Sequence, residues 1–263
     1  MTMFFLNQLI FNYNARKLRG RIMQIYFIRH AQSSNNDLYD RTGKSDGRNE
    51  DPELSPIGKI QAKLLSEYLL NNSNQNLRNI NNDPHNRFGY YFNTCLASPM
   101  VRAIETGWEC TKLMGLQLKL CVDLHEGGGI FLENSNKELI GLPGKPKSYF
   151  LKRYPGIIVD EHISEEGWWN QPFEPQEIRK ARAKRVWDMI FKEYDDSSRI
   201  VLFSHFGFFN YFLSALINFE WSETVKFKMN NAGISRIDVN DDRSLKEIVY
   251  INKVDFLPNE LIT

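Results

Sequence analysis

Ile25-Tyr26-Phe27-Ile28-Arg29-His30 is the stretch that decides the fold of this chain. Its first four residues are β-branched or aromatic, which predicts a buried strand. Arg29 and His30 follow without a spacer, and a loop-like run of Ala, Gln, Ser and Asn comes next. In open α/β sheets, ligand sites form beyond the carboxyl ends of the strands. The sequence therefore places a cation and an imidazole at a functional edge.

Three later segments repeat this arrangement of a strand followed by ionisable residues. A helix expected to begin after Ser98-Pro99 carries Arg102 in its first turn, while Glu126 and His205 each lie in the few residues after a strand. For Arg102 alone, the alternative is a surface ion pair with Glu105. Alternating strands and helices imply a mostly parallel sheet, whose carboxyl strand ends share one edge. We therefore expect these side chains to converge. The strands concerned are predicted over residues 90–97, 116–122 and 199–203.

Two guanidinium groups, two imidazoles and one carboxyl group form a set suited to phosphoryl transfer. Guanidiniums bind a phosphoryl group through forked hydrogen bonds. A neutral imidazole can attack phosphorus and hold it covalently, and a second imidazole can donate to the equatorial oxygens. A carboxylic acid can protonate the leaving alkoxide and then act as a base toward water.

As an ordered set, these motifs resemble those of the histidine phosphatase superfamily, also called the phosphoglycerate mutase-like family. The resemblance spans about residues 23–239. It implies an α/β fold, a three-layer α/β/α sandwich whose mainly parallel sheet has an antiparallel edge strand. The matching segments are Arg29-His30-Ala31-Gln32-Ser33-Ser34-Asn35-Asn36, Leu54-Ser55-Pro56-Ile57-Gly58, Ala97-Ser98-Pro99-Met100-Val101-Arg102-Ala103-Ile104-Glu105-Thr106 and Phe203-Ser204-His205.

The resemblance also implies a role for each site residue. The protein would be a phosphoric monoester hydrolase that forms a covalent phosphohistidine and needs no metal or other cofactor. Its substrate would be a phosphorylated small molecule, with a phosphoprotein as another option. The implied roles are His30 as nucleophile, Glu126 as proton donor, Arg29, Arg102 and His205 as the phosphate pocket, and Ser33 and Asn36 as residues that line it.

Three departures from the family pattern concern the substrate more than the chemistry. Ala31 stands where glycine is usual, a small change if the backbone there is not left-handed. Phe206 replaces the glycine after the second histidine and places a bulky ring near the rim. The segment Gly127-Gly128-Gly129 replaces a common Trp-Glu-Gly pattern.

Residues 23–263 are expected to form a single domain with a cap-like, irregular insertion over the site at about residues 130–176. An N-terminal arm, residues 1–22, is rich in basic residues and has no acidic ones. This arm either lacks order or carries a mitochondrial-type targeting signal, and we favour a dispensable arm on a cytoplasmic protein.

Composition excludes several classes of function. A formal net charge of +1 gives no field that would recruit nucleic acid, and no segment is long and apolar enough to span a membrane. Three cysteines without close spacing indicate a reducing compartment. No histidine or cysteine pair has metal-ligand spacing. The oligomeric state is left open.

Two other functions fit the same motifs. A phosphoglycerate mutase would retain the phosphoryl group and return it to another oxygen, but the 130–176 segment is not obviously built to keep water out. A non-catalytic protein of the same fold would bind a partner through its aromatic cover. Because all the catalytic groups are present, phosphatase ranks first.

Overall fold

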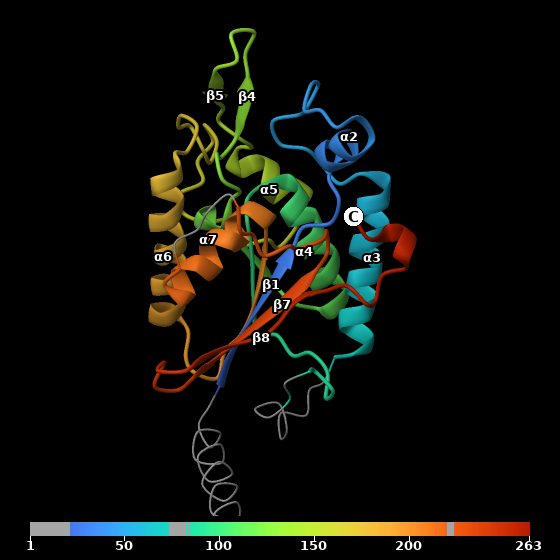
Figure 1. The fold of residues 1–263 in the computed structure, drawn as a ribbon, viewed down its shortest axis with the longest axis vertical. Helices are drawn as coiled ribbons and strands as arrows, with labels where there is room; N and C mark the ends of the chain where they lie inside the picture. Colours follow the sequence, from blue (N-terminus) through green and yellow to red (C-terminus); the bar gives the residue numbers. More distant parts are fainter. Residues whose placement is uncertain (1–21, 74–82, 84, 220–223) are drawn as a thin grey trace, which may run out of the picture.

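A six-stranded sheet forms the centre of the computed structural model, which describes residues 22–73, 83, 85–219 and 224–263 (Figure 1). The strand order is β3-β2-β6-β1-β7-β8. β3, β2, β6 and β1 pair in parallel, whereas β7 pairs antiparallel with β1, and β8 with β7. The predicted sheet, mainly parallel with an antiparallel edge, is confirmed. The strands are β1 (Ile22–Arg29), β2 (Thr94–Ala97), β3 (Leu118–Leu120), β6 (Arg199–Ser204), β7 (Ile234–Asn240) and β8 (Lys246–Lys253).

Helices cover both faces of the sheet. Side chains alternate between the faces of a strand, and β1 is apolar on both. Tyr26 and Ile28 belong to the apolar core beneath one pair of helices, and Ile25 and Phe27 to the core beneath the other pair. The three-layer sandwich is therefore confirmed (Figure 1). The helices are α3 (Pro56–Asn71) and α4 (Val101–Met114) on the first face, and α6 (Gln176–Glu193) and α7 (Phe206–Ile217) on the second.

Helices α3 and α4 both form after the Ser-Pro signals that predict them. Ser55 caps α3 by accepting the N–H of Gly58 at 3.0 Å, and Pro56 occupies the first helical turn. Helix α4 runs over Val101–Met114 with Met100 as its N-cap, within one residue of the predicted start after Ser98-Pro99. Arg102 lies in the first turn, as expected.

Two predicted strands are shorter than the sequence indicates. The 90–97 strand is limited to Thr94–Ala97, because the N–H of Tyr90 donates to Asn72 instead of joining the sheet. The 116–122 strand is limited to Leu118–Leu120, since the N–H of Val122 donates to the carboxylate of Asp160. A 3₁₀ helix, η2 (Val122–Leu124), follows it.

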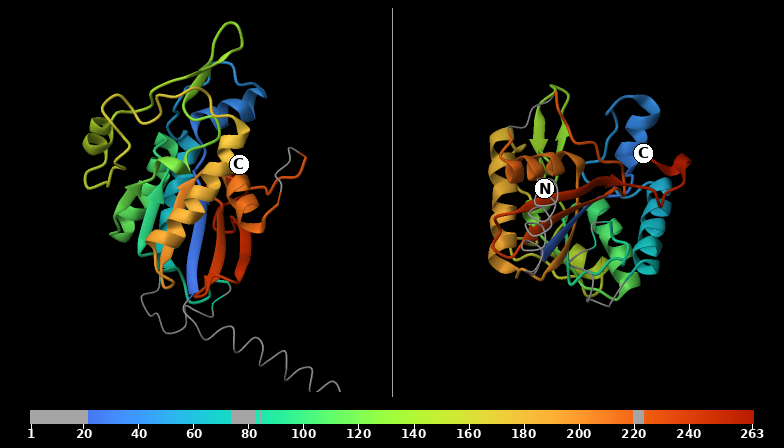
Figure 2. Two further views of the ribbon diagram at one scale, coloured as in Figure 1. Left: turned by 90° about the vertical axis from the view of Figure 1, so that its left-hand side faces the viewer. Right: turned by 60° about the horizontal axis from the view of Figure 1, so that its bottom comes forward.

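The 130–176 segment contains more regular structure than expected. It holds the hairpin of β4 (Phe131–Glu133) and β5 (Leu139–Gly141) and the helix α5 (Lys147–Arg153). The hairpin and α2 (Ser34–Thr42) lie at the same end of the molecule, beyond the carboxyl end of β1 (Figures 1 and 2). Trp168 and Trp169 are buried in this segment.

The described chain starts at β1 and ends just after the 3₁₀ helix η3 (Asn259–Leu261). Residues 1–21 lie outside the described residues, and with them the prediction of an N-terminal arm. Within the described residues, no helix combines the length and apolar character needed to cross a membrane.

Candidate active site

Two histidines from neighbouring parallel strands face each other at the carboxyl edge of the sheet. His30 directly follows β1 and His205 directly follows β6, and their ring centroids are 5.1 Å apart. The backbone N–H of His30 donates to the carbonyl of Ser204 over 2.9 Å, so the parallel pairing of β1 and β6 sets this spacing. Both side chains are buried.

Hydrogen bonds select one tautomer of His30. Its Nδ1 lies 2.7 Å from the carbonyl oxygen of Ala31, so Nδ1 carries the proton. Its Nε2 accepts from Nε of Arg102 at 3.2 Å and therefore holds the lone pair. Burial, Arg102 and Arg29 lower the pKa of His30 well below 6.5. His30 is thus a neutral imidazole whose Nε2 can act as a nucleophile.

One ring nitrogen of His205, Nε2, has a hydrogen-bond partner, and the second, Nδ1, faces the site. Its Nε2 lies 2.8 Å from Oγ of Ser98, and this oxygen also accepts the N–H of Met100. Among the described residues, Nδ1 of His205 is buried without a hydrogen-bond partner. Burial lowers the pKa of His205, so the ring is neutral. If Ser98 donates to Nε2, then Nδ1 carries a proton that suits an anionic oxygen.

Arg102 reaches His30 from the first turn of α4. Its Nη1 lies 4.0 Å from Oδ1 of Asp51, and its Nη2 donates to Sδ of Met100. Burial raises the pKa of Asp51 to about 6, against the opposing effect of Arg102. The alternative ion pair with Glu105 is absent, because that carboxylate accepts from Leu54 and Arg153.

Arg29, the last residue of β1, directly precedes His30. Its Nη1 donates to the carbonyl of Met229 at 2.6 Å, and its guanidinium carbon lies 5.6 Å from the ring centroid of Phe206. Burial lowers the pKa of Arg29 to about 10, so the group stays charged at neutral pH. The bulky ring predicted near the rim at position 206 is therefore in contact with a site cation.

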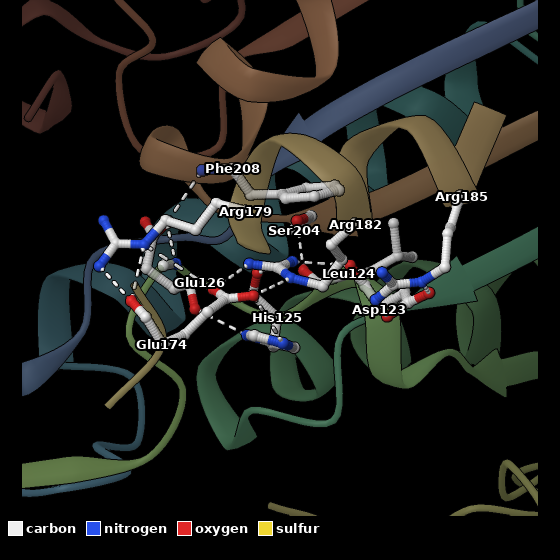
Figure 3. A network of polar contacts seen from close by, with 11 residues as sticks. Asp123, Leu124, His125, Glu126, Glu174, Arg179, Arg182, Arg185, Ser204 and Phe208 are labelled. Atoms are coloured by element: carbon white, nitrogen blue, oxygen red, sulfur yellow. Dashed lines mark hydrogen bonds and ion pairs between the residues drawn. The ribbon is translucent and has the colours of Figure 1, made fainter. Parts of the chain in front are cut away.

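Glu126 is held by the first turn of α7. Its Oε1 accepts the N–H of Phe208 at 2.9 Å (Figure 3). Oε1 also accepts the N–H of Gly127 at 2.8 Å, and Oε2 accepts that of Gly207 at 3.0 Å. A Cβ added to Gly207 would lie 2.5 Å from Oε1, so this approach requires glycine. Glu126 also interacts electrostatically with Arg29 and Arg102. The turn that follows His205 thus places the carboxylate beside the histidines.

A buried ion pair fixes the loop that carries Glu126. Arg182 of α6 donates to both carboxylate oxygens of Glu174, and to the backbone carbonyls of Asp123 and His125, all at 2.7 Å (Figure 3). Its guanidinium carbon lies 4.7 Å from the ring centroid of Phe208, whose N–H binds Glu126. Three segments distant in sequence therefore meet around one guanidinium.

Ser33 and Asn36 form the N-terminal cap of α2. Oγ of Ser33 accepts the N–H of Asn36 at 3.2 Å, and Oδ1 of Asn36 accepts the N–H of Ser33 at 3.1 Å. Nδ2 of Asn231 donates to the carbonyl of His30 at 2.9 Å and lies 3.4 Å from Oδ1 of Asn36. These side chains hold the loop after His30, and within the described residues Nδ2 of Asn36 donates to no protein group.

Two residues in or next to the motifs, His125 and Ala31, have structural surroundings that explain them. The ring of His125 packs 4.6 Å from Trp169, its Nε2 lies 3.9 Å from Glu174, and its Nδ1 lies 2.7 Å from the backbone carbonyl of Glu126, so neither ring nitrogen contacts the Glu126 carboxylate. Ala31 is fully buried and its backbone is not left-handed, which explains why it replaces glycine without strain.

Sequence reasoning missed several residues of this site. Ser98 lies within the motif at 97–106, and Asp51 lies three residues before the motif at 54–58. Their proximity to these motifs is the signal that could have identified them. Asn231, Glu174 and Arg182 had none, since each acts across long sequence separations. In the described part of the chain, no group of three or more His, Cys, Asp or Glu is arranged to hold a metal ion.

Comparison with known proteins identifies the family of the chain. Residues 25–253 match the family model of the histidine phosphatase superfamily, branch 1. The chain belongs to the histidine phosphatase superfamily. This match confirms the predicted relationship and the expected class of protein, an enzyme of the phosphatase type. A search of curated proteins found no match.

Solved structures of three phosphatases share the superfamily fold. A mycobacterial glucosyl-3-phosphoglycerate phosphatase has a TM-score of 0.55 and 17% identity, covering 89% of this chain and 100% of that one. Phosphoserine phosphatase from Entamoeba histolytica has a TM-score of 0.55 and 19% identity, over 90% and 100%. A putative α-ribazole-5'-phosphate phosphatase from Escherichia coli has a TM-score of 0.55 and 18% identity, over 88% and 96%.

Proposed function

We propose that this member of the superfamily hydrolyses phosphoric monoesters through a phosphohistidine at His30. The observation that carries the proposal is the tautomer of His30, which its hydrogen bonds fix. Its Nδ1 is fixed by the carbonyl of Ala31, and its Nε2 lone pair faces the guanidinium of Arg102. A neutral nucleophile beside two cations is suited to attack on an anionic phosphoryl group.

In the first half-reaction, Nε2 of His30 forms a bond to phosphorus as the ester P–O bond breaks. Arg29, Arg102 and Nδ1–H of His205 stabilise the negative charge on the equatorial oxygens. Glu126 gives its proton to the leaving oxygen. Among the described residues, Oε2 of Glu126 accepts one hydrogen bond and Oε1 accepts two, so Oε2 has the lone pair that can carry this proton.

In the second half-reaction, water attacks the phosphohistidine. Glu126 removes a proton from the water as the P–O bond forms and the bond from phosphorus to Nε2 breaks. The products are inorganic phosphate, neutral His30 and protonated Glu126, so the site returns to its starting state. No step needs a metal ion.

The substrate we propose is a small phosphorylated molecule. The similar structures are named for glucosyl-3-phosphoglycerate, phosphoserine and α-ribazole-5'-phosphate phosphatases. We place the protein in the cytoplasm, because Cys95, Cys110 and Cys121 are buried thiols that form no disulfide.

Phosphate release from a panel of esters tests the proposal. Wild-type protein should release inorganic phosphate and, after acid-free quenching, carry acid-labile phosphate, whereas His30→Ala should show neither while keeping its melting temperature. Transfer of phosphate to another hydroxyl without release would identify a mutase. If no ester leaves acid-labile phosphate on the protein, the result would favour a binding protein that has lost catalysis.

A further inference from the structure

Four side chains form a continuous row beside the proposed catalytic residues. The guanidinium carbon of Arg48 lies 4.4 Å from the ring centroid of Phe131. The rings of Phe131 and Phe173 meet edge to face at 4.7 Å, and the guanidinium carbon of Arg179 lies 5.2 Å from Phe173. The row joins the loop after α2, the β4–β5 hairpin, the end of the 130–176 segment and α6. We call it the rim row.

The rim row lies directly against the turn that follows Glu126. A Cβ added to Gly128 would lie 2.5 Å from Phe173 and 2.7 Å from Phe131. At the other end of the row, Arg48 is close enough to Arg102 to lower the pKa of that guanidinium. The row therefore runs from the proposed proton donor to the cation that contacts His30. This is where the leaving group of a substrate would project.

The two cations of the rim row differ in their partners. Nε and Nη2 of Arg179 donate to the carbonyl of Glu174 at 3.1 and 2.8 Å, and its Nε lies 3.8 Å from the carboxylate. Arg48, in contrast, has no carboxylate partner among the described residues, and its Nε is buried without an acceptor. Burial lowers the pKa of Arg48, with no acidic group opposing the change. A half-buried cation without an anion is costly.

The backbone around Arg48 is fixed by hydrogen bonds. Its N–H donates to the carbonyl of Ser45 at 3.2 Å. The next residue, Asn49, exchanges two hydrogen bonds with the side chain of Asn35, at 2.7 and 2.9 Å. The Phe131 ring occupies one face of the guanidinium, which leaves its N–H edge for a forked bond to an anion. The side chain is thus positioned before any ligand binds.

We propose that Arg48 binds a second anionic group, a carboxylate or a phosphate, on the leaving-group part of the substrate. The inference rests on the proposed function and names its substrate class, phosphomonoesters that carry a further negative charge. Arg29, Arg102 and His205 hold the scissile phosphate, and Arg48 selects the alcohol to which it is attached. Phe131 holds the guanidinium in place.

Matched pairs of esters test this subsite. 3-Phosphoglycerate and glycerol 3-phosphate differ only by a carboxylate in place of a hydroxymethyl group. Glucose 1,6-bisphosphate and glucose 6-phosphate make the same comparison for a second phosphate group. Arg48→Gln should lower kcat/KM for the more charged member of the preferred pair by about ten- to hundred-fold. It should leave the less charged member within about two-fold, since a neutral group makes no charged hydrogen bond.

Arg87→Gln is the matched control. Arg87 is an exposed arginine 5.8 Å from the ring of Phe88, in the segment before β2 and so near the opposite end of the parallel strands. Its replacement should leave kcat/KM unchanged for both esters of a pair. Equal losses on both members of a pair in Arg48→Gln, or no discrimination by the wild type in either pair, would overturn the proposal.

A binding measurement separates this inference from the proposed reaction. In the His30→Ala background, calorimetry should show that 3-phosphoglycerate or the bisphosphate binds more tightly than its less charged partner. Adding Arg48→Gln should remove the difference. If wild-type protein hydrolyses no ester but this difference appears, the phosphatase proposal fails and the subsite stands. Equal binding of both members in the His30→Ala protein refutes the subsite.

Discussion

Replacing Arg182 by methionine removes a guanidinium that is 1% exposed and makes four hydrogen bonds at 2.7 Å. The change leaves the Glu174 carboxylate, 3% exposed, without its main partner. Breaking a buried pair in this way costs about 3–5 kcal/mol of unfolding free energy. The carbonyls of Asp123 and His125 also lose a donor, at about 1–3 kcal/mol each. Arg179, whose Nε lies 3.8 Å from the carboxylate, offsets part of the loss.

We therefore expect Arg182→Met to lower the unfolding free energy by about 3–5 kcal/mol, because these contributions are not additive. Urea unfolding at pH 7.5, followed by tryptophan fluorescence, measures this as a lower midpoint with an unchanged slope. The double variant Glu174→Met/Arg182→Met should regain much of the loss, since no buried charge is left unpaired.

Arg185→Met provides the control on the same helix. Arg185 pairs with Asp123 at 2.9 Å, but its side chain is 54% exposed, so its loss should cost less than about 1 kcal/mol. A loss below about 1 kcal/mol for Arg182→Met would refute the reasoning. So would a double variant that is no more stable than the single one.

Four further predictions concern chemistry, pH and packing. Glu126→Gln should slow alkyl phosphates about 10²–10⁴-fold in kcat/KM but p-nitrophenyl phosphate far less; equal losses would assign the proton to another group. Burial lowers the pKa of His125 well below 6.5. The unfolded chain therefore binds a proton below pH 6.5 that the folded chain does not, and the unfolding free energy decreases as the pH is lowered. Between pH 7.5 and 5.5, His125→Gln should lose about 1 kcal/mol less than the wild type in urea unfolding, whereas parallel curves would contradict this. Chelators should leave phosphate release unchanged, and inhibition would revive a metal mechanism. Gly58→Ala should lower the unfolding free energy by about 1–3 kcal/mol, because a Cβ there would lie 1.9 Å from the carbonyl oxygen of Gln32; an unchanged urea midpoint would show that the loop can move.

The sequence by itself determined the order of the strands of the main sheet and of the helices α3, α4, α6 and α7 that cover it, and the edge at which the site forms. A run such as Ile25–Ile28 is apolar at every position, so it predicts a strand buried on both faces. Parallel strands place their carboxyl ends together, and Arg29, His30 and His205 could be assigned to that edge from their positions alone. Local signals of this kind act within a few residues. They placed Arg102 in the first turn of α4, which starts at Val101, one residue after the predicted start.

Only the tertiary structure decided which partner each polar side chain takes. Glu126 binds the N–H groups of α7, about eighty residues later in the chain, and Arg182 binds the loop before it. The ring of His125 contacts Trp169, Glu174 and the backbone carbonyl of Glu126 instead of the Glu126 carboxylate. No local pattern encodes such choices, since they depend on which elements meet across the sandwich and on how burial penalises a polar group left without a partner.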